Sequence, residues 1–119
     1  MLAVGPAMKV TIYLNQDTSS AQGFLHDEIL AFLREKGVGV GGATVLRPYA
    51  GFGSHGRLHK SDDGDVGGLH LPVVIFFVET TEKVNSILPS LLERVVDGLV
   101  EAHPTQILKN ITGAEKVIS

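Results

Sequence analysis

The densest set of side chains capable of chemistry lies in one polar stretch, over residues 53–70. It holds three of the five histidines and three aspartates: His55, His59, His70, Asp62, Asp63 and Asp65. Imidazole and carboxylate groups suit zinc or another first-row metal ion, but a site needs three or four converging ligands. The spacing of His55 and His59 would suit a helix, which Gly56 disfavours. The sequence therefore favours a flexible polar loop over a metal site.

Two glycines at the start of this loop are candidates for binding an anion. Gly51 and Gly53 flank Phe52, and glycine lets backbone N–H groups approach a phosphate closely. Arg57, His59 and Lys60 are the cations of the loop, and Arg57 could contact a phosphate through two N–H groups and Lys60 as a point charge. Solvated charge is the commoner role of such residues. A turn ending a strand explains the glycines equally well. Neither a Walker A nor a Rossmann glycine motif is present.

Catalysis has little support in the sequence. Serine, histidine and aspartate occur, but no nucleophile-elbow pattern orients them. The other carboxylates fall mostly on predicted helix surfaces, where solvated charge is ordinary: Glu28, Glu35, Glu79, Glu82 and Glu93. We therefore expect a protein that is not an enzyme, with no catalytic residue and no resident cofactor.

Length and composition exclude several classes of protein. The chain has 119 residues, 44% of them apolar, which suits one domain with a real core. Its net charge of −3 gives no basic face for nucleic acid, and it has no cysteine for disulfides or thiolate zinc sites. No apolar run is long enough to span a membrane. We expect a cytoplasmic domain over residues 8–108, with flexible termini at 1–7 and 109–119.

Hydrophobic periodicity predicts the elements that must position these residues. Alternation predicts a strand over Met8–Leu14, and the Ser19/Gln22 capping-box pattern opens a helix that runs to about Lys36, with Gly37 as its stop. A second strand is predicted over Ala43–Ala50.

The second half of the chain repeats this pattern. An unbroken apolar run predicts a strand over Leu71–Val78 that is buried on both faces. A helix follows from Thr81 to Asp97-Gly98, with a kink or irregularity expected at Pro89. A short last strand is predicted over Thr105–Leu108.

The order β-α-β-β-α-β predicts a ferredoxin-like α+β fold, an antiparallel sheet with both helices on one face. A long insertion, residues 53–70, separates its second and third strands. The third strand is apolar on both faces, and Tyr13 lies on the second face of the first strand. Because an open apolar face needs a cover, we expect the chain to form a symmetric homo-oligomer.

The ordered motifs Gly42-Ala43-Thr44-Val45, Gly51-Phe52-Gly53 and Leu71-Pro72-Val73-Val74-Ile75 resemble the PII-like signalling superfamily. The similarity is greatest to its branch catalogued as a domain of unknown function, and it covers Met8 to about Leu108. The resemblance implies a homotrimer that binds adenine nucleotides in clefts between subunits. It also implies that the insertion is a T-loop, which changes shape on ligand binding and contacts a partner protein.

The resemblance also implies the ligand-binding residues. Thr44 matches a threonine that lines the nucleotide cleft, and Gly51, Phe52 and Gly53 match the entrance to the T-loop. Arg57 could neutralise the phosphate. Asp97, Gly98 and Leu99 fall where PII proteins carry a longer loop with lysines, so a monophosphate such as AMP, or a cyclic nucleotide, fits better than a triphosphate.

Two alternatives stay open at this point. A trimeric divalent-metal-tolerance protein shares this chain order, and the loop histidines would then carry the metal. A small enzyme on a dimeric ferredoxin-like sheet is the other alternative.

For a PII-like protein, a membrane transporter or an enzyme is the partner expected for the loop 53–70.

Overall fold

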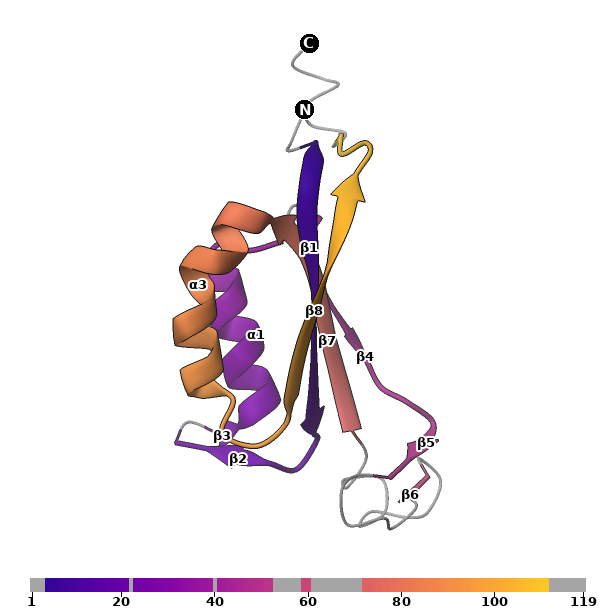
Figure 1. The fold of residues 1–119 in the computed structure, drawn as a ribbon. Coiled ribbons are helices and arrows are strands. Elements are labelled where there is room, and N and C mark those ends of the chain that lie inside the picture. The colour runs from indigo at the N-terminus through magenta and orange to yellow at the C-terminus, as the bar shows by residue number, and fades with distance from the viewer. Residues whose placement is uncertain (1–3, 22, 40, 53–58, 61–71, 112–119) are drawn as a thin grey trace.

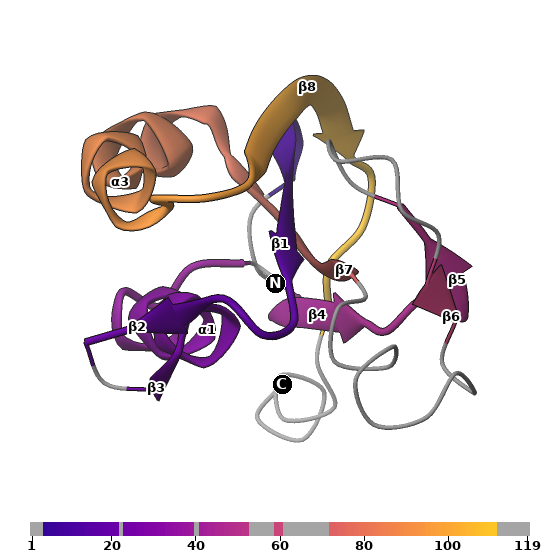
Figure 2. The same ribbon diagram turned by 90° about the horizontal axis from the view of Figure 1, so that it is seen from below.

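The computed structural model describes residues 4–21, 23–39, 41–52, 59–60 and 72–111. Its main sheet has four antiparallel strands in the order β4-β7-β1-β8. These strands are β1 (Gly5–Asn15), β4 (Ala43–Leu46), β7 (Pro72–Thr80) and β8 (Leu99–Ile107). Two helices, α1 (Leu25–Glu35) and α3 (Thr81–Arg94), cover one face of the sheet, and the other face is left open (Figures 1 and 2). The predicted ferredoxin-like arrangement is confirmed.

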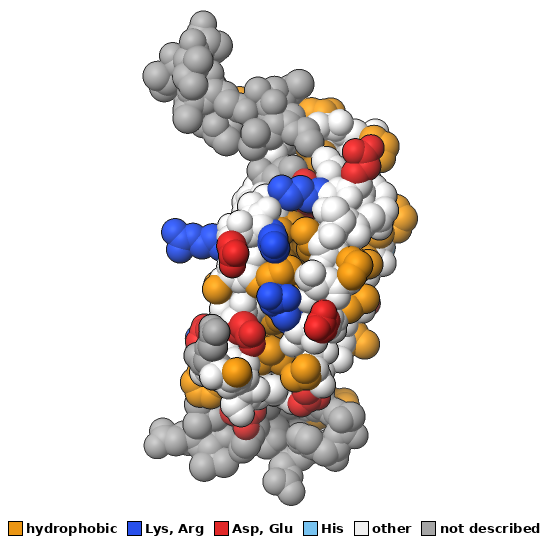
Figure 3. All heavy atoms as spheres, turned by 90° about the vertical axis from the view of Figure 1, so that its left-hand side faces the viewer, with side chains coloured by type: hydrophobic (Ala, Val, Ile, Leu, Met, Phe, Trp, Pro, Cys, Tyr) orange, Lys and Arg blue, Asp and Glu red, His pale blue; other side chains and the backbone are white. Residues whose placement is uncertain are grey.

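The core lies between the helices and the alternate residues of the two central strands. On the sheet it is formed by Val10, Ile12, Leu14, Val73, Ile75 and Phe77. The helices contribute Leu25, Ile29, Phe32, Leu33, Val84, Ile87 and Leu91. The outer face of the helix layer mixes acidic and basic side chains with apolar ones (Figure 3). No helix of the described residues is long and apolar enough to cross a membrane.

The first helix ends as predicted but begins later. Val38 N donates to the Leu33 carbonyl and Gly37 N to the Arg34 carbonyl, which is the Schellman pattern, with Gly37 at φ 64°. The start predicted at Ser19 is wrong, because Ser19–Ser20 (β2) pairs with Gly23–Phe24 (β3) as a short hairpin. The Thr18 carbonyl then accepts the amide hydrogen of Leu25, the first helical residue.

The second helix and its flanking strands also differ from the prediction. Thr80 caps α3 by accepting a hydrogen bond from Lys83 N, and the helix continues through Pro89 to Arg94. Pro89 does not interrupt the helix, and the kink expected there stays a prediction. The helix ends before Asp97-Gly98, so β8 begins at Leu99 and is much longer than Thr105–Leu108.

Strand bounds account for the remaining differences. β1 begins at Gly5 rather than Met8, because residues 5–7 pair with 105–107. The predicted strand Ala43–Ala50 is two pieces: β4, and β5 (Ala50–Gly51), which pairs with β6 (His59–Lys60). β7 is buried on alternate residues, not on both faces. Glu79, assigned above to a solvated surface, is a buried residue of β7 with 5% of its surface exposed.

Candidate functional site

Thr44 lies on the edge strand β4, on the open face of the sheet. Its neighbours Ala43 and Val45 pack against the core, so strand alternation turns Thr44 and Leu46 to the opposite side. Thr44 pairs with Phe76 of β7, and its side chain is exposed. A hydroxyl in this position is free of the core and can meet a ligand or a neighbouring molecule.

Gly51 and Phe52 follow further along the chain, in and after β5 of the separate β5–β6 sheet. Gly51 pairs with His59 in the β5–β6 hairpin, and a Cβ there would meet Pro72 Cγ at 3.4 Å, so space is limited. Phe52 is 67% exposed, which is unusual for a large aromatic residue and leaves its ring free to stack. Gly53 and Arg57, predicted to continue this site, lie outside the described residues.

Asp97, Gly98 and Leu99 lie at the other edge of the sheet, where the chain enters β8. Gly98 has φ 151°, and a Cβ there would overlap the Tyr13 carbonyl oxygen. Packing against the end of β1 is thus enough to require glycine at this position. Leu99 is 56% exposed and begins the edge strand. The turn has no lysine, as the sequence shows.

The predicted residues therefore form two separate groups in one chain. Thr44 lies on the β4 edge of the main sheet, and Gly51 and Phe52 lie beyond it, in and after β5 of the separate β5–β6 sheet. Asp97–Leu99 lies at the β8 edge. Three strand spacings separate these edges, about 14 Å for a regular sheet. One chain does not bring the two groups into a single cleft.

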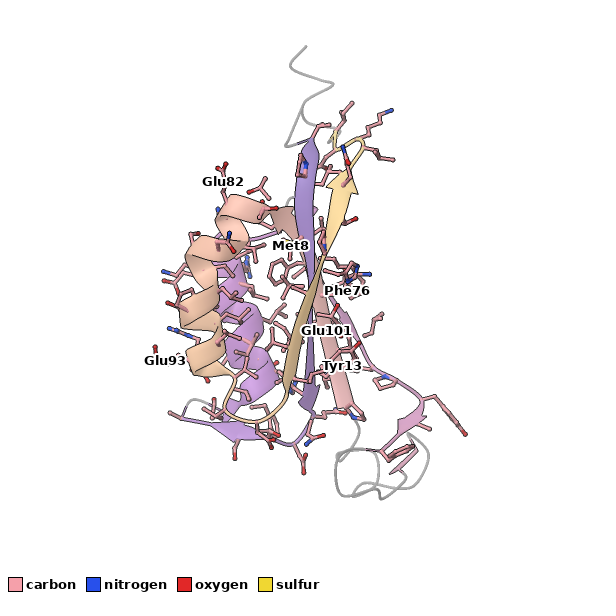
Figure 4. All side chains as sticks on the ribbon, viewed as in Figure 1. Met8, Tyr13, Phe76, Glu82, Glu93 and Glu101 are labelled. Atoms are coloured by element: carbon pink, nitrogen blue, oxygen red, sulfur yellow. The ribbon has the colours of Figure 1, made fainter. Side chains whose placement is uncertain are left out.

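Polar groups that were not among the predicted site residues lie on the open face between the two edges. The Tyr13 hydroxyl donates to Glu101 Oε1 at 3.0 Å, and Lys9 Nζ lies 4.7 Å from the centre of the Phe76 ring. Tyr13, Phe76 and Glu101 all lie on the side away from the helices, whereas Met8 faces them (Figure 4). The alternation of β1 is the sequence signal that could have placed Lys9 and Tyr13 together.

The hydrogen bond to Glu101 has an electrostatic consequence for Tyr13. Glu101 accepts the hydrogen bond of the phenol and carries a negative charge, and both effects raise the pKa of Tyr13 above its ordinary value of 10.0. The open face thus carries a neutral hydroxyl beside a carboxylate. It also carries a cation, Lys9, over an aromatic ring.

No metal site is found in the part of the chain that the structure describes. Within it, no group of three or more histidines, aspartates and glutamates converges. Of the loop residues named above, His59 is described only in its backbone pairing with Gly51. His55, His70 and the three loop aspartates lie outside the described residues, so the metal alternative is not tested.

Solved structures with the same fold are PII-like proteins. Two structures of CPII, a nitrogen regulatory PII-like protein from Thiomonas intermedia K12, are described as bound to ADP, AMP and bicarbonate. The first matches with TM-score 0.60 and 21% identity, over 92% of this chain and 94% of that chain. The second, at 2.3 Å, matches with TM-score 0.57 and 22% identity, over 89% and 99%. A CPII structure bound to ADP and bicarbonate matches with TM-score 0.58 and 23% identity, over 92% and 95%.

The sequence itself matches one family model over nearly the whole described domain. That family is described as DUF190, "Uncharacterized ACR", and the match covers residues 7–107. This range runs from the first strand of the sheet to the end of β8, so it includes every element of the fold. The chain belongs to the DUF190 family, an uncharacterised branch with the PII-like fold.

Proposed function

We propose that this chain is a PII-like regulatory protein that binds an adenine nucleotide between the subunits of a homotrimer. Thr44, Gly51 and Phe52 of one subunit face Asp97–Leu99 of the next, and Gly53 and Arg57 extend the first group toward the phosphate. The protein is a sensor rather than an enzyme and has no resident cofactor.

The observation that carries the proposal is the position of Thr44 and of Asp97–Leu99 at opposite edges of one sheet, β4 and β8. A contact between the β4 edge of one copy and the β8 edge of another is heterologous, because it joins two different surfaces. Repeating such a contact closes a ring when the rotation permits. A ring of three, as in the PII-like resemblance, completes three identical clefts.

The open face of the sheet supports the same assembly. Beside its polar pairs it carries the half-buried Val74, Phe76 and Val78, together with Leu46 at 51% exposure. When a second surface removes the apolar side chains on one face of a sheet from water, the free energy of the assembly is lowered. Facing the sheets of three copies toward one another would cover them.

The choice of ligand rests on the chemistry of the edges and on the structural neighbours. All three CPII structures are described as bound to ADP, and two of them also to AMP. In this chain the turn at Asp97–Leu99 offers a carboxylate and no lysine, so it provides little positive charge for a triphosphate. The exposed Phe52 ring suits stacking on an adenine base, and the Thr44 hydroxyl suits a hydrogen bond to the polar edge of that base. AMP is therefore the favoured ligand.

The loop 53–70 is the proposed output of the sensor. It begins directly after Gly51 and Phe52, so a ligand held there would contact some loop conformations and not others. A ligand that contacts only some conformations of the loop shifts the population toward those conformations. The loop would then bind its partner, a membrane transporter or an enzyme, in a nucleotide-dependent way.

Calorimetry with AMP, ADP, ATP and GMP tests the ligand. We expect AMP and ADP to bind and to raise the melting temperature, with GMP much weaker. Thr44→Val removes the hydroxyl at nearly constant volume and should weaken AMP binding, whereas Thr105→Val, an exposed threonine on β8, should not. Absence of any heat or thermal shift with all four nucleotides at millimolar concentration would rule out this ligand class.

A further inference from the structure

The loop between α1 and β4 is held by two side chains from the corner between β7 and α3. Gly39 N donates to Glu79 Oε2 at 2.9 Å, and Lys83 Nζ donates to the Gly37 carbonyl at 3.4 Å. The other carboxylate oxygen of Glu79 accepts from Thr80 N at 2.8 Å. Both oxygens of this buried carboxylate thus bond to backbone N–H groups, one of them in a distant segment.

The loop needs such an external hold because of its composition. Gly37, Gly39 and Gly42 have φ values of 64°, 91° and 84°, which other residues rarely adopt. At Gly39 a Cβ would lie 2.5 Å from the Gly42 carbonyl oxygen, so glycine is required there. A glycine-rich segment has many alternative conformations, and a charge-assisted hydrogen bond to a buried group selects one of them.

The strand that follows this loop, β4, makes few pairs of its own that fix its register. β4 has four residues, Ala43–Leu46, and pairs with Phe77–Val74 at the edge of the sheet. A shift of one residue in a strand moves every side chain to the opposite face, and only Ala43 and Val45 pack β4 against the core to resist it. Such a slip would take Thr44 off the open face and into the core.

Glu79 and β4 are linked through the same strand. Glu79 lies two positions after Phe77, the partner of Ala43, so its bond to Gly39 adds a fixed point just ahead of the first β4 pair. Gly42 N donates to the Gly39 carbonyl at 2.9 Å and carries this constraint to the residue before the strand. We propose that Glu79 is a positioning residue that fixes the register of β4 and thereby presents Thr44 and the Gly51–Phe52 entrance to the ligand.

The effect of Glu79 on ligand binding rests on the proposed function, but its effect on the register of β4 does not. Two measurements therefore test the role of Glu79. The first is hydrogen exchange of the amides of residues 39–46, which needs no ligand. The second is AMP affinity by calorimetry. Glu79→Gln keeps the size of the side chain but sets an NH2 group against one of two backbone donors. Glu79→Ala removes both acceptors.

Glu82 provides the matched control. It is an exposed acid three residues further along, in the first turn of α3, and it has no hydrogen bond to the loop in the contacts described here. Lys83→Met removes the weaker contact to Gly37 without altering a buried carboxylate.

We expect exchange of amides 39–46 to quicken by about tenfold in Glu79→Gln and more in Glu79→Ala. Lys83→Met should show a smaller effect of the same sign, and Glu82→Gln none. If the fraction of molecules that hold β4 in the register of this structure falls to about a tenth, the AMP dissociation constant rises about tenfold. Exchange at 39–46 that is as slow in both Glu79 variants as in Glu82→Gln would overturn the proposal. Should wild type bind no nucleotide, the ligand claim fails while the exchange data still decide the role of Glu79.

Discussion

At the scale of single residues, the pair Tyr13–Glu101 is the most directly testable electrostatic feature. The two side chains come from neighbouring strands and meet on the open face at 3.0 Å. The raised pKa of Tyr13 follows first from donating to Glu101 and second from its charge. The hydrogen bond needs the neutral phenol, so its stabilisation is present below pH 10 and is lost as pH rises through the raised pKa.

Glu101→Gln should lower the pKa of Tyr13 toward 10.0, because the amide is uncharged and a weaker acceptor. The chain has two tyrosines, so the titration is read from tyrosinate absorbance in a Tyr49→Phe background. Glu93→Gln, an exposed change on α3, is the control and should leave the titration unchanged. An unchanged pKa in Glu101→Gln would show that the pair does not form in solution.

At the scale of elements, the turn from α3 into β8 depends on Gly98. Its φ of 151° and the Tyr13 carbonyl oxygen leave no room for a side chain. Gly98→Ala should therefore destabilise the fold by about 2 kcal/mol. Gly41→Ala is the matched control, since a Cβ there has open space and should be neutral or slightly stabilising. Urea unfolding at one protomer concentration measures both, and equal midpoints would contradict the packing explanation.

The same turn shows why part of the fold could not be predicted from the sequence. The apolar stripe of α3 continues into Val95 and Val96, so periodicity predicts a helix end that is too late. The missing first part of β8 has a separate cause, because its strand structure is set by pairing with β1. Ser19 has the right spacing for a capping box, but the β2–β3 hairpin takes that segment instead. By contrast Gly37 was predicted correctly, because its role as a helix stop depends on local backbone geometry alone.

At the scale of the whole molecule, sheet order decides how the candidate residues can act. The motifs at Thr44 and at Gly98 are both readable in the sequence, but their separation onto opposite edges is set by the order β4-β7-β1-β8. Glu79 lies beyond the strand predicted to end at Val78, although in β7 it continues the buried alternation of Val73, Ile75 and Phe77. Its hydrogen bond to Gly39 joins two segments far apart in the sequence, which no local pattern reports. Non-local packing therefore limits prediction of the site more than of the elements.

The proposed assembly of three protomers uses the open face as an interface, which a matched pair of substitutions can test. Leu46 on β4 and Leu92 on α3 are exposed to nearly the same extent, 51% and 50%, but only Leu46 lies on the open face. Leu46→Lys should lower the mass measured by light scattering toward that of one protomer, because a buried unpaired ammonium is costly in an apolar interface. Leu92→Lys should keep the wild-type mass. A Leu46→Lys protein that still assembles like wild type, or a monomeric wild type, would exclude the open face as the interface.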